Sequence, residues 1–104
     1  MTIVVVATIK VKPESVDTFR AILTGAVEDI HKEPGCELYA LHQNGPTFVM
    51  VEQWVDSEAL RTHSAAPAAT RLFAAADEHL EEAPDIRIFK PLAAGDPDKG
   101  RLRR

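Results

Sequence analysis

The chain opens with a strand-forming segment that is apolar on both faces, and this segment restricts the possible folds more than any other feature. Residues 2–12 are rich in β-branched side chains, which favour a pleated, extended backbone. Alternation places Ile3, Val5, Ala7, Ile9 and Val11 on one face, and Val4, Val6, Thr8, Lys10 and Lys12 on the other. A strand with two apolar faces needs other protein segments packed against both of them.

The other segments predict a β-α-β-β-α-β order. Apolar residues at helical spacing indicate helices, and two strands around Asn44-Gly45-Pro46 indicate an antiparallel hairpin. Asp56 and Ser57 are candidate caps for a short helix. The predicted elements are strands at 2–12, 36–43, 47–55 and 85–89, and helices from 13 to about 33, from 58 to 64 and from 67 to about 82. This order predicts an α+β protein with a ferredoxin-like antiparallel sheet.

The third predicted strand also has apolar residues on both of its faces. One of its faces holds Phe48, Met50 and Trp54, and the other holds Val49, Val51 and Val55. Two helices cover only one face of such a sheet. A bare second face would exceed the roughly 400 Å² that monomers seldom expose. We therefore expect a homodimer in which two sheets pack face to face about a two-fold axis.

Size and charge narrow the class of protein. The 104 residues suffice for one domain, predicted at 1–92, and a flexible basic tail is predicted at 93–104, ending in Arg101, Arg103 and Arg104. The net charge of −4 argues against a nucleic-acid partner. Lys10 interrupts the apolar start too early for a signal peptide or a membrane span, and Cys36 is the single cysteine. We expect a cytoplasmic protein without a membrane or nucleic-acid partner.

His63 is the principal candidate for chemistry. It follows Leu60 by three residues, so both lie on the inward face of the short predicted helix. A neutral imidazole at such a position can take a proton from a phenol or a quinol. The alternative is a packed histidine that is bonded to a backbone carbonyl.

Glu52 and Trp54 share the inner face of the third strand. A buried unpaired carboxylate is costly, so Glu52 needs a partner. The sequence leaves open whether it orients His63, binds a backbone amide, or pairs with Arg71 or Arg87. Trp54 either stacks on an aromatic substrate or belongs to the core.

Four further residues have candidate or excluded roles. Tyr39 either donates a hydrogen bond to a substrate oxygen or is buried with a backbone partner. His31 lies at the end of the first predicted helix, where a cation is favourable, so it receives no catalytic role. His79, among acidic residues, is predicted to be exposed to solvent, and Cys36 to be a small buried apolar residue.

Five segments stand in an order typical of one family. They are Val5 to Pro13, Glu33-Pro34-Gly35-Cys36, Phe48 to Trp54, Ser57-Glu58-Ala59-Leu60 with His63, and Lys90-Pro91-Leu92. Over about residues 2–92 the chain resembles the antibiotic biosynthesis monooxygenase family, within the dimeric α+β barrel superfamily. The resemblance implies a homodimer forming a shared barrel, with one pocket per protomer between sheet and helices. Some members oxidise quinols, anthrones or aromatic polyketides with O₂ and without metal or flavin; others cleave haem or isomerise a small sugar derivative.

Three departures bear on haem. Haem-degrading members carry Asn at the position of Ala7, Trp at that of His63 and a haem-ligating His at that of Phe73, so haem cleavage is disfavoured. Many quinol-oxidising members have a second histidine where this chain has Ala68. That difference argues against a mechanism with two histidines.

The leading hypothesis is a monooxygenase without cofactor or metal that oxidises a small aromatic, quinol or polyketide-like molecule. His63 is its base, and the expected substrate-binding residues are Trp54, Glu52, Phe48, Tyr39, Phe73 and Ala7. Two alternatives stay open. One is a non-catalytic dimeric protein that binds a small ligand, and the other is an isomerase of a small hydroxy-carbonyl compound.

Overall fold

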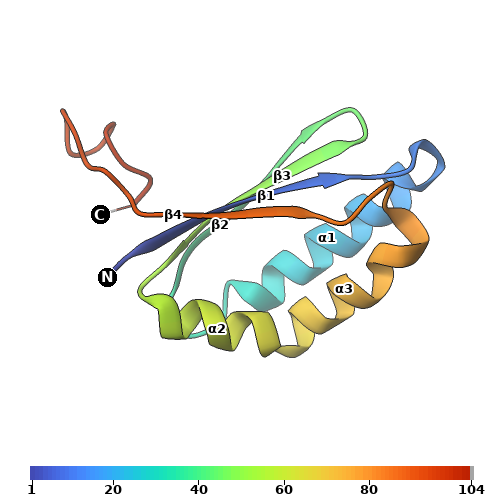
Figure 1. Ribbon diagram of the computed structural model, residues 1–104, viewed down its shortest axis with the longest axis horizontal. Helices are drawn as coiled ribbons and strands as arrows, with labels where there is room; N and C mark the ends of the chain where they lie inside the picture. The colour runs from blue at the N-terminus through green and yellow to red at the C-terminus, as the bar shows by residue number, and fades with distance from the viewer. Residues whose placement is uncertain (104) are drawn as a thin grey trace.

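A computed structural model describes residues 1–103. Four strands form one antiparallel sheet in the order β2-β3-β1-β4, and the helices lie together on one face of it (Figure 1). The elements are β1 (Ile3–Lys10), a 3₁₀ turn (Pro13–Ser15), α1 (Val16–Ile30), β2 (Cys36–Asn44), β3 (Thr47–Trp54), α2 (Ser57–Ala65), α3 (Pro67–His79) and β4 (Asp85–Phe89). The predicted α+β class and the β-α-β-β-α-β order of elements along the chain are confirmed.

Two helices end earlier than predicted. α1 ends at Ile30 instead of near residue 33, and the chain then turns through Gly35, whose φ of 80° is in the left-handed region. α3 ends at His79 instead of near residue 82. Leu80 there adopts an extended backbone and forms a bridge with Val11, which competes with helix continuation.

Strand register determines which side chains meet beneath the helices. Val5 pairs with Glu52 in β3, and Glu52 pairs with Tyr39 in β2, so these three residues form one row across the inner face. An irregularity between Cys36 and Leu38 inserts one extra residue into β2. Because of this β-bulge, Cys36 and Tyr39 both lie on the inner face although they are three residues apart.

The inner face supports two hydrophobic clusters. We call them the Trp54 cluster and the Phe48 cluster after their largest members. The Trp54 cluster contains Val5, Ala7, Ile30, Tyr39, Met50, Trp54 and Ala68. The Phe48 cluster contains Ile9, Val11, Phe19, Leu23, Phe48 and Leu80.

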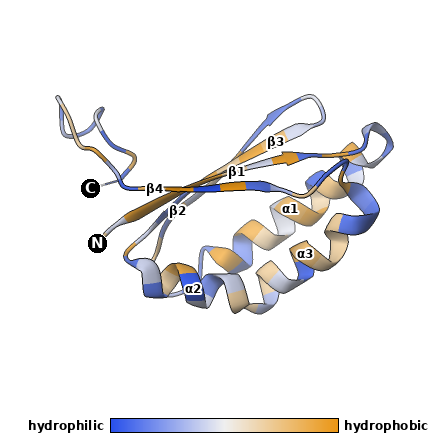
Figure 2. Ribbon diagram, viewed as in Figure 1, coloured by the Kyte–Doolittle hydropathy of each residue, from blue (hydrophilic) through white to orange (hydrophobic). Residues whose placement is uncertain are grey.

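No helix of the described residues lies on the outer face of the sheet (Figures 1 and 2), and this face is apolar at its centre, in β1 and β3. Val4, Val6, Val49 and Val51 lie on it and are only partly buried. Phe89 of β4, which pairs with Val4, is 48% exposed. The helices therefore cover only the inner face of the sheet, as the sequence predicts.

The C-terminal segment turns away from the helices (Figure 1). Gly100 donates a backbone hydrogen bond to Asp96, and the Arg103 carbonyl accepts one from the Gln53 side chain on the outer face. Arg104 lies outside the described residues. Flexibility of the segment and a domain limit at residue 92 stay predictions. Within residues 1–103, no helix combines the length and the apolar character needed to cross a bilayer.

Candidate active site

α2 carries His63 and is fixed at its first turn. The Asp56 carboxylate accepts a hydrogen bond of 2.8 Å from the Ala59 amide, which confirms the predicted cap. The turn after α1 packs closely on the same helix, since a Cβ added to Gly35 would lie 2.5 Å from the Ala59 Cβ. Glycine at this position therefore allows the α1–β2 connection to approach α2.

His63 is held by three side chains from different elements. Its Nδ1 lies 2.6 Å from Oε1 of Glu33, and both side chains are largely buried. The Trp54 ring stacks on the imidazole with centroids 4.5 Å apart and planes at 29°. The Tyr39 ring approaches edge-on at 5.5 Å. These contacts fix the ring in place.

Glu52 has a different partner from those considered in the sequence analysis. Its Oε1 accepts a hydrogen bond of 2.9 Å from the Trp54 indole Nε1–H. The arginines considered there pair elsewhere, Arg71 with Asp29 and Arg87 with Asp85. Burial raises the pKa of Glu52 to about 7, against the lowering effect of the indole hydrogen bond.

Tyr39 and Cys36 lie near this group. Burial raises the pKa of the Tyr39 hydroxyl, and the nearby Glu52 raises it further, so the phenol stays protonated and can donate. Burial also raises the pKa of the half-buried Cys36 thiol, which keeps it from acting as a thiolate.

A cavity of about 110 Å³ lies between the inner face of the sheet and the helices. Its walls are mostly apolar, and its polar lining comes from Tyr39, Glu52, His63 and Ser64. The lining also includes Phe73 and Ile86, which are 53% and 50% exposed. Because these two are open to solvent, we place the entrance between α3 and β4.

Three polar atoms in this lining lack a protein partner among residues 1–103: His63 Nε2, Tyr39 Oη and Glu52 Oε2. They belong to residues that are at most 8% exposed. No fully enclosed side-chain nitrogen or oxygen of the described residues is without a hydrogen bond, so these three atoms must border accessible space. A ligand in the cavity can therefore meet three polar groups close to one another.

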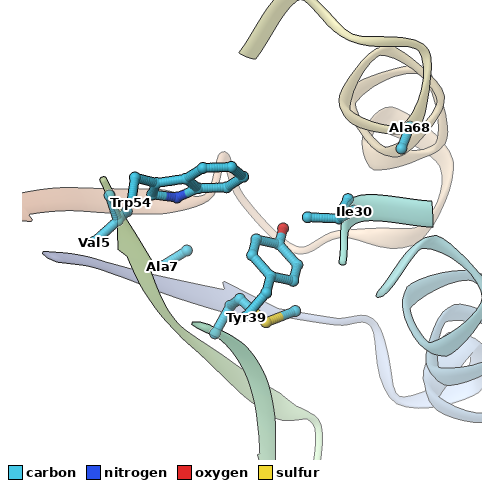
Figure 3. Close-up of a cluster of buried hydrophobic side chains, with 7 residues drawn as sticks. Val5, Ala7, Ile30, Tyr39, Trp54 and Ala68 are labelled. Atoms are coloured by element: carbon cyan, nitrogen blue, oxygen red, sulfur yellow. The ribbon is translucent and has the colours of Figure 1, made fainter. Parts of the chain in front are cut away.

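The structure separates the substrate-binding residues that the sequence predicts. Ala7, Tyr39, Glu52 and Phe73 line the cavity with His63. Trp54 lies behind the imidazole and is not among the lining residues. Figure 3 shows the Tyr39 hydroxyl pointing from the sheet toward the helix layer, beside Trp54 and Ile30. Phe48 belongs to the other cluster and is fully buried there.

The remaining histidines lie outside this cavity. His31 Nε2 lies 3.0 Å from the Tyr39 carbonyl and ties the end of α1 to β2. The prediction that His79 is exposed is wrong, because its side chain is only 14% exposed. Its Nδ1 lies 3.0 Å from the Ser15 hydroxyl, and its ring packs on Phe19.

Glu33 is the site residue that sequence reasoning missed. It lies 30 residues from His63, so no local periodicity connects them. The available signal was its position directly before Pro34-Gly35, the break that returns the chain toward the sheet.

Within residues 1–103, no group of three His, Cys, Asp or Glu side chains is arranged to hold a metal ion.

The fold and the cavity together define a ferredoxin-like protein with a mostly apolar cavity beneath the helices. The family model for antibiotic biosynthesis monooxygenases matches residues 2–75. The chain therefore belongs to the antibiotic biosynthesis monooxygenase family, as the sequence resemblance predicted.

Solved structures agree with this assignment. A protein from Methanosarcina mazei Go1 is 31% identical, with 86% of this chain and 92% of that chain covered and a TM-score of 0.81. A structure described as an antibiotic biosynthesis monooxygenase is 28% identical, with 86% and 98% covered and a TM-score of 0.81. A curated protein from Synechocystis is 30% identical over 91 residues, and the match spans 62% of that protein's length and 85% of this chain.

Proposed function

We propose that the protein is a cofactor-independent monooxygenase that oxidises a small aromatic, quinol or polyketide-like substrate with O₂. The observation that carries this proposal is the mostly apolar cavity in which His63 Nε2, Tyr39 Oη and Glu52 Oε2 lack protein partners. Membership in the family supports the same reaction class.

His63, Tyr39 and the apolar walls of the cavity each have a part in the proposed chemistry. His63 takes the proton of a phenol-type hydroxyl, which makes the ring electron-rich enough to pass an electron to O₂. Tyr39, whose phenol stays protonated, donates a hydrogen bond to the substrate oxygen. The apolar walls exclude water from the resulting anion and its oxygen adduct.

The reaction balances for a substrate with a reactive methylene between aromatic rings. Two C–H bonds break and one C=O bond forms with an oxygen atom from O₂. The second oxygen atom leaves as water with the two hydrogens. The substrate supplies all the electrons, so no further reductant is needed.

We also propose that two copies pack through the outer faces of their sheets and so form the barrel expected from the sequence. The partly buried apolar residues of that face support this proposal, since the helices cover only the opposite face (Figure 2). The mass in dilute solution, measured by light scattering, tests it. A value near twice 11.4 kDa is expected, and a monomer would refute the proposed dimer.

Oxygen consumption tests the proposed reaction. Metal-free protein is mixed with dithranol and with reduced naphthoquinone, under air and under nitrogen. We expect O₂ uptake that falls by about 10²- to 10⁴-fold in His63→Gln. His79→Gln is the matched control, because its imidazole lies outside the cavity.

Other outcomes would contradict the proposal and favour the alternatives. Tight binding of these compounds with no O₂ uptake indicates a ligand-binding protein. Conversion of a hydroxy-carbonyl compound under nitrogen indicates an isomerase. If O₂ uptake is unchanged in His63→Gln, His63 is not the catalytic base.

A further inference from the structure

We propose that Glu33 is the positioning residue of His63, because it fixes the imidazole with Nδ1 protonated and the Nε2 lone pair facing the cavity. The catalytic consequence rests on the proposed function, but the state of the ring does not. Glu33 itself is not among the lining residues of the cavity, so it acts through His63.

The geometry of the pair supports this role. The separation of 2.6 Å between Nδ1 and Oε1 is that of a short, charge-assisted hydrogen bond. The side chains of His63 and Glu33 are only 9% and 15% exposed, so water competes little for either atom. The contact therefore differs from the weak ion pairs at the protein surface, such as that of Arg71 with Asp29.

The ring has little freedom to turn away from Glu33. Stacking on Trp54 restricts tilting, and the edge of Tyr39 closes another side. A ring flip would place a carbon against the Glu33 carboxylate and would lose the hydrogen bond. The packing and the hydrogen bond therefore select the same orientation.

The backbone of Glu33 is itself held in place. Its amide donates to the Ile30 carbonyl at 3.0 Å, and its carbonyl accepts from the Cys36 amide at 3.2 Å. Two residues later, Gly35 packs against α2, and its carbonyl accepts from the Val55 amide at 2.9 Å. The turn that carries the carboxylate is thereby fixed to the helix that carries the imidazole.

Elementary chemistry then determines the tautomer. A neutral imidazole has one donor nitrogen and one acceptor nitrogen, and an ionised carboxylate can only accept. Nδ1 must therefore carry the proton, and Nε2 has the free lone pair in the cavity. When Nε2 takes the substrate proton, the carboxylate stabilises the resulting imidazolium.

The tautomer can be observed without any substrate. In ¹⁵N spectra of the full-length protein, recorded at a pH where the imidazole is neutral, His63 should show a protonated Nδ1 and an unprotonated Nε2. His63→Gln assigns the signals. In Glu33→Ala the ring should shift toward the Nε2–H tautomer, whereas in Glu28→Gln, which changes an exposed acid of α1, the signals should not move.

Two spectral results would overturn the proposal: an Nε2–H tautomer in the wild type, or unchanged His63 signals in Glu33→Ala. Circular dichroism and thermal melting check that the variant is folded. Glu33→Gln, which keeps an oxygen acceptor and removes the charge, gives a second reading if Glu33→Ala does not fold.

Kinetics test the catalytic consequence separately. With a substrate identified by O₂ uptake, Glu33→Gln should lower kcat about 10- to 100-fold with little change in KM, because the ground-state cavity is intact. A rise in KM alone would contradict positioning. If no O₂ uptake is found in the wild type, the monooxygenase proposal fails, and the tautomer assignment is still decided by the spectra.

Discussion

The two clusters beneath the helices are built on the same strands but have different contents. The Phe48 cluster consists of aliphatic and aromatic side chains packed around Phe48, which is fully buried. The Trp54 cluster adjoins His63 and Glu52, two of the polar residues that are nearly inaccessible. β1 and β3 contribute to both clusters, so strand alternation alone does not distinguish them.

The contacts of His79 and His63 illustrate the difference between the surroundings of the two clusters. His79, beside the Phe48 cluster, lies 3.0 Å from the Ser15 hydroxyl and 3.8 Å from the exposed carboxylate of Glu78, and it does not line the cavity. His63 lies 2.6 Å from the largely buried carboxylate of Glu33 and lines the cavity. Most members of the Phe48 cluster also line the cavity, so the two clusters differ in the polar groups beside them rather than in access to the cavity.

Removal of a core ring should have the largest effect on stability. Phe48→Ala leaves a void in the cluster that consists only of apolar side chains, and we expect the free energy of unfolding to fall by about 3–5 kcal/mol. Urea unfolding measures it. Phe73→Ala, which truncates a ring that is 53% exposed, is the matched control and should cost much less. Equal losses would show that the Phe48 cluster has no special structural role.

Glu52, which adjoins the Trp54 cluster, should make the stability of the protein depend on pH. Since the pKa of Glu52 is raised from 4.5 to about 7 in the folded state, that state holds its proton while the unfolded chain has released it. The stability contributed by protonated Glu52 is full below about pH 4.5 and is lost as the pH rises through 7. Glu52→Gln should remove this decline, which is on the order of 1 kcal/mol per pH unit.

Urea unfolding at several pH values between 5 and 8 measures that slope. Glu28→Gln, an exposed acid-to-amide change, is the control and should keep the wild-type slope. A Glu52→Gln variant whose slope equals that of the wild type would show that Glu52 is ionised in the folded protein.

The smallest effect on stability is expected at His79. His79→Gln loses the hydrogen bond to Ser15, and we expect a loss of about 0.5–1.5 kcal/mol in unfolding free energy. The ¹⁵N signals of His63 should not move. A change in those signals would show that the two ends of the sheet are coupled rather than separate.

The architecture was predictable from the sequence because it follows from local patterns. Alternation in β1 and β3, the Asn44-Gly45-Pro46 turn and the Asp56 cap each act over a few residues. The inner face of β3 was also predictable, because Phe48, Met50, Glu52 and Trp54 are spaced two apart.

The partners within the site were less predictable because they depend on contacts between distant segments. Glu52 was considered as the residue that orients His63, yet it bonds to Trp54, and Glu33 takes that place. His79 was expected in solvent because its neighbours in sequence are acidic, but the approach of Ser15 and Phe19 encloses it. Sequence spacing gives the face of an element, but not which of several carboxylates comes within bonding distance.

The β-bulge at the start of β2 has a consequence for how this cavity can change. The residues from Leu38 onward take their register from the hairpin with β3, while Glu33 lies on the far side of the extra residue. Cys36 on that side still pairs with Trp54, so removal of Glu37 alone would convert the bulge into a regular ladder and leave both flanking segments in register with β3. The phenol of Tyr39 and the turn that carries Glu33 thus share one anchoring strand, and the surroundings of His63 should tolerate loss of the extra residue.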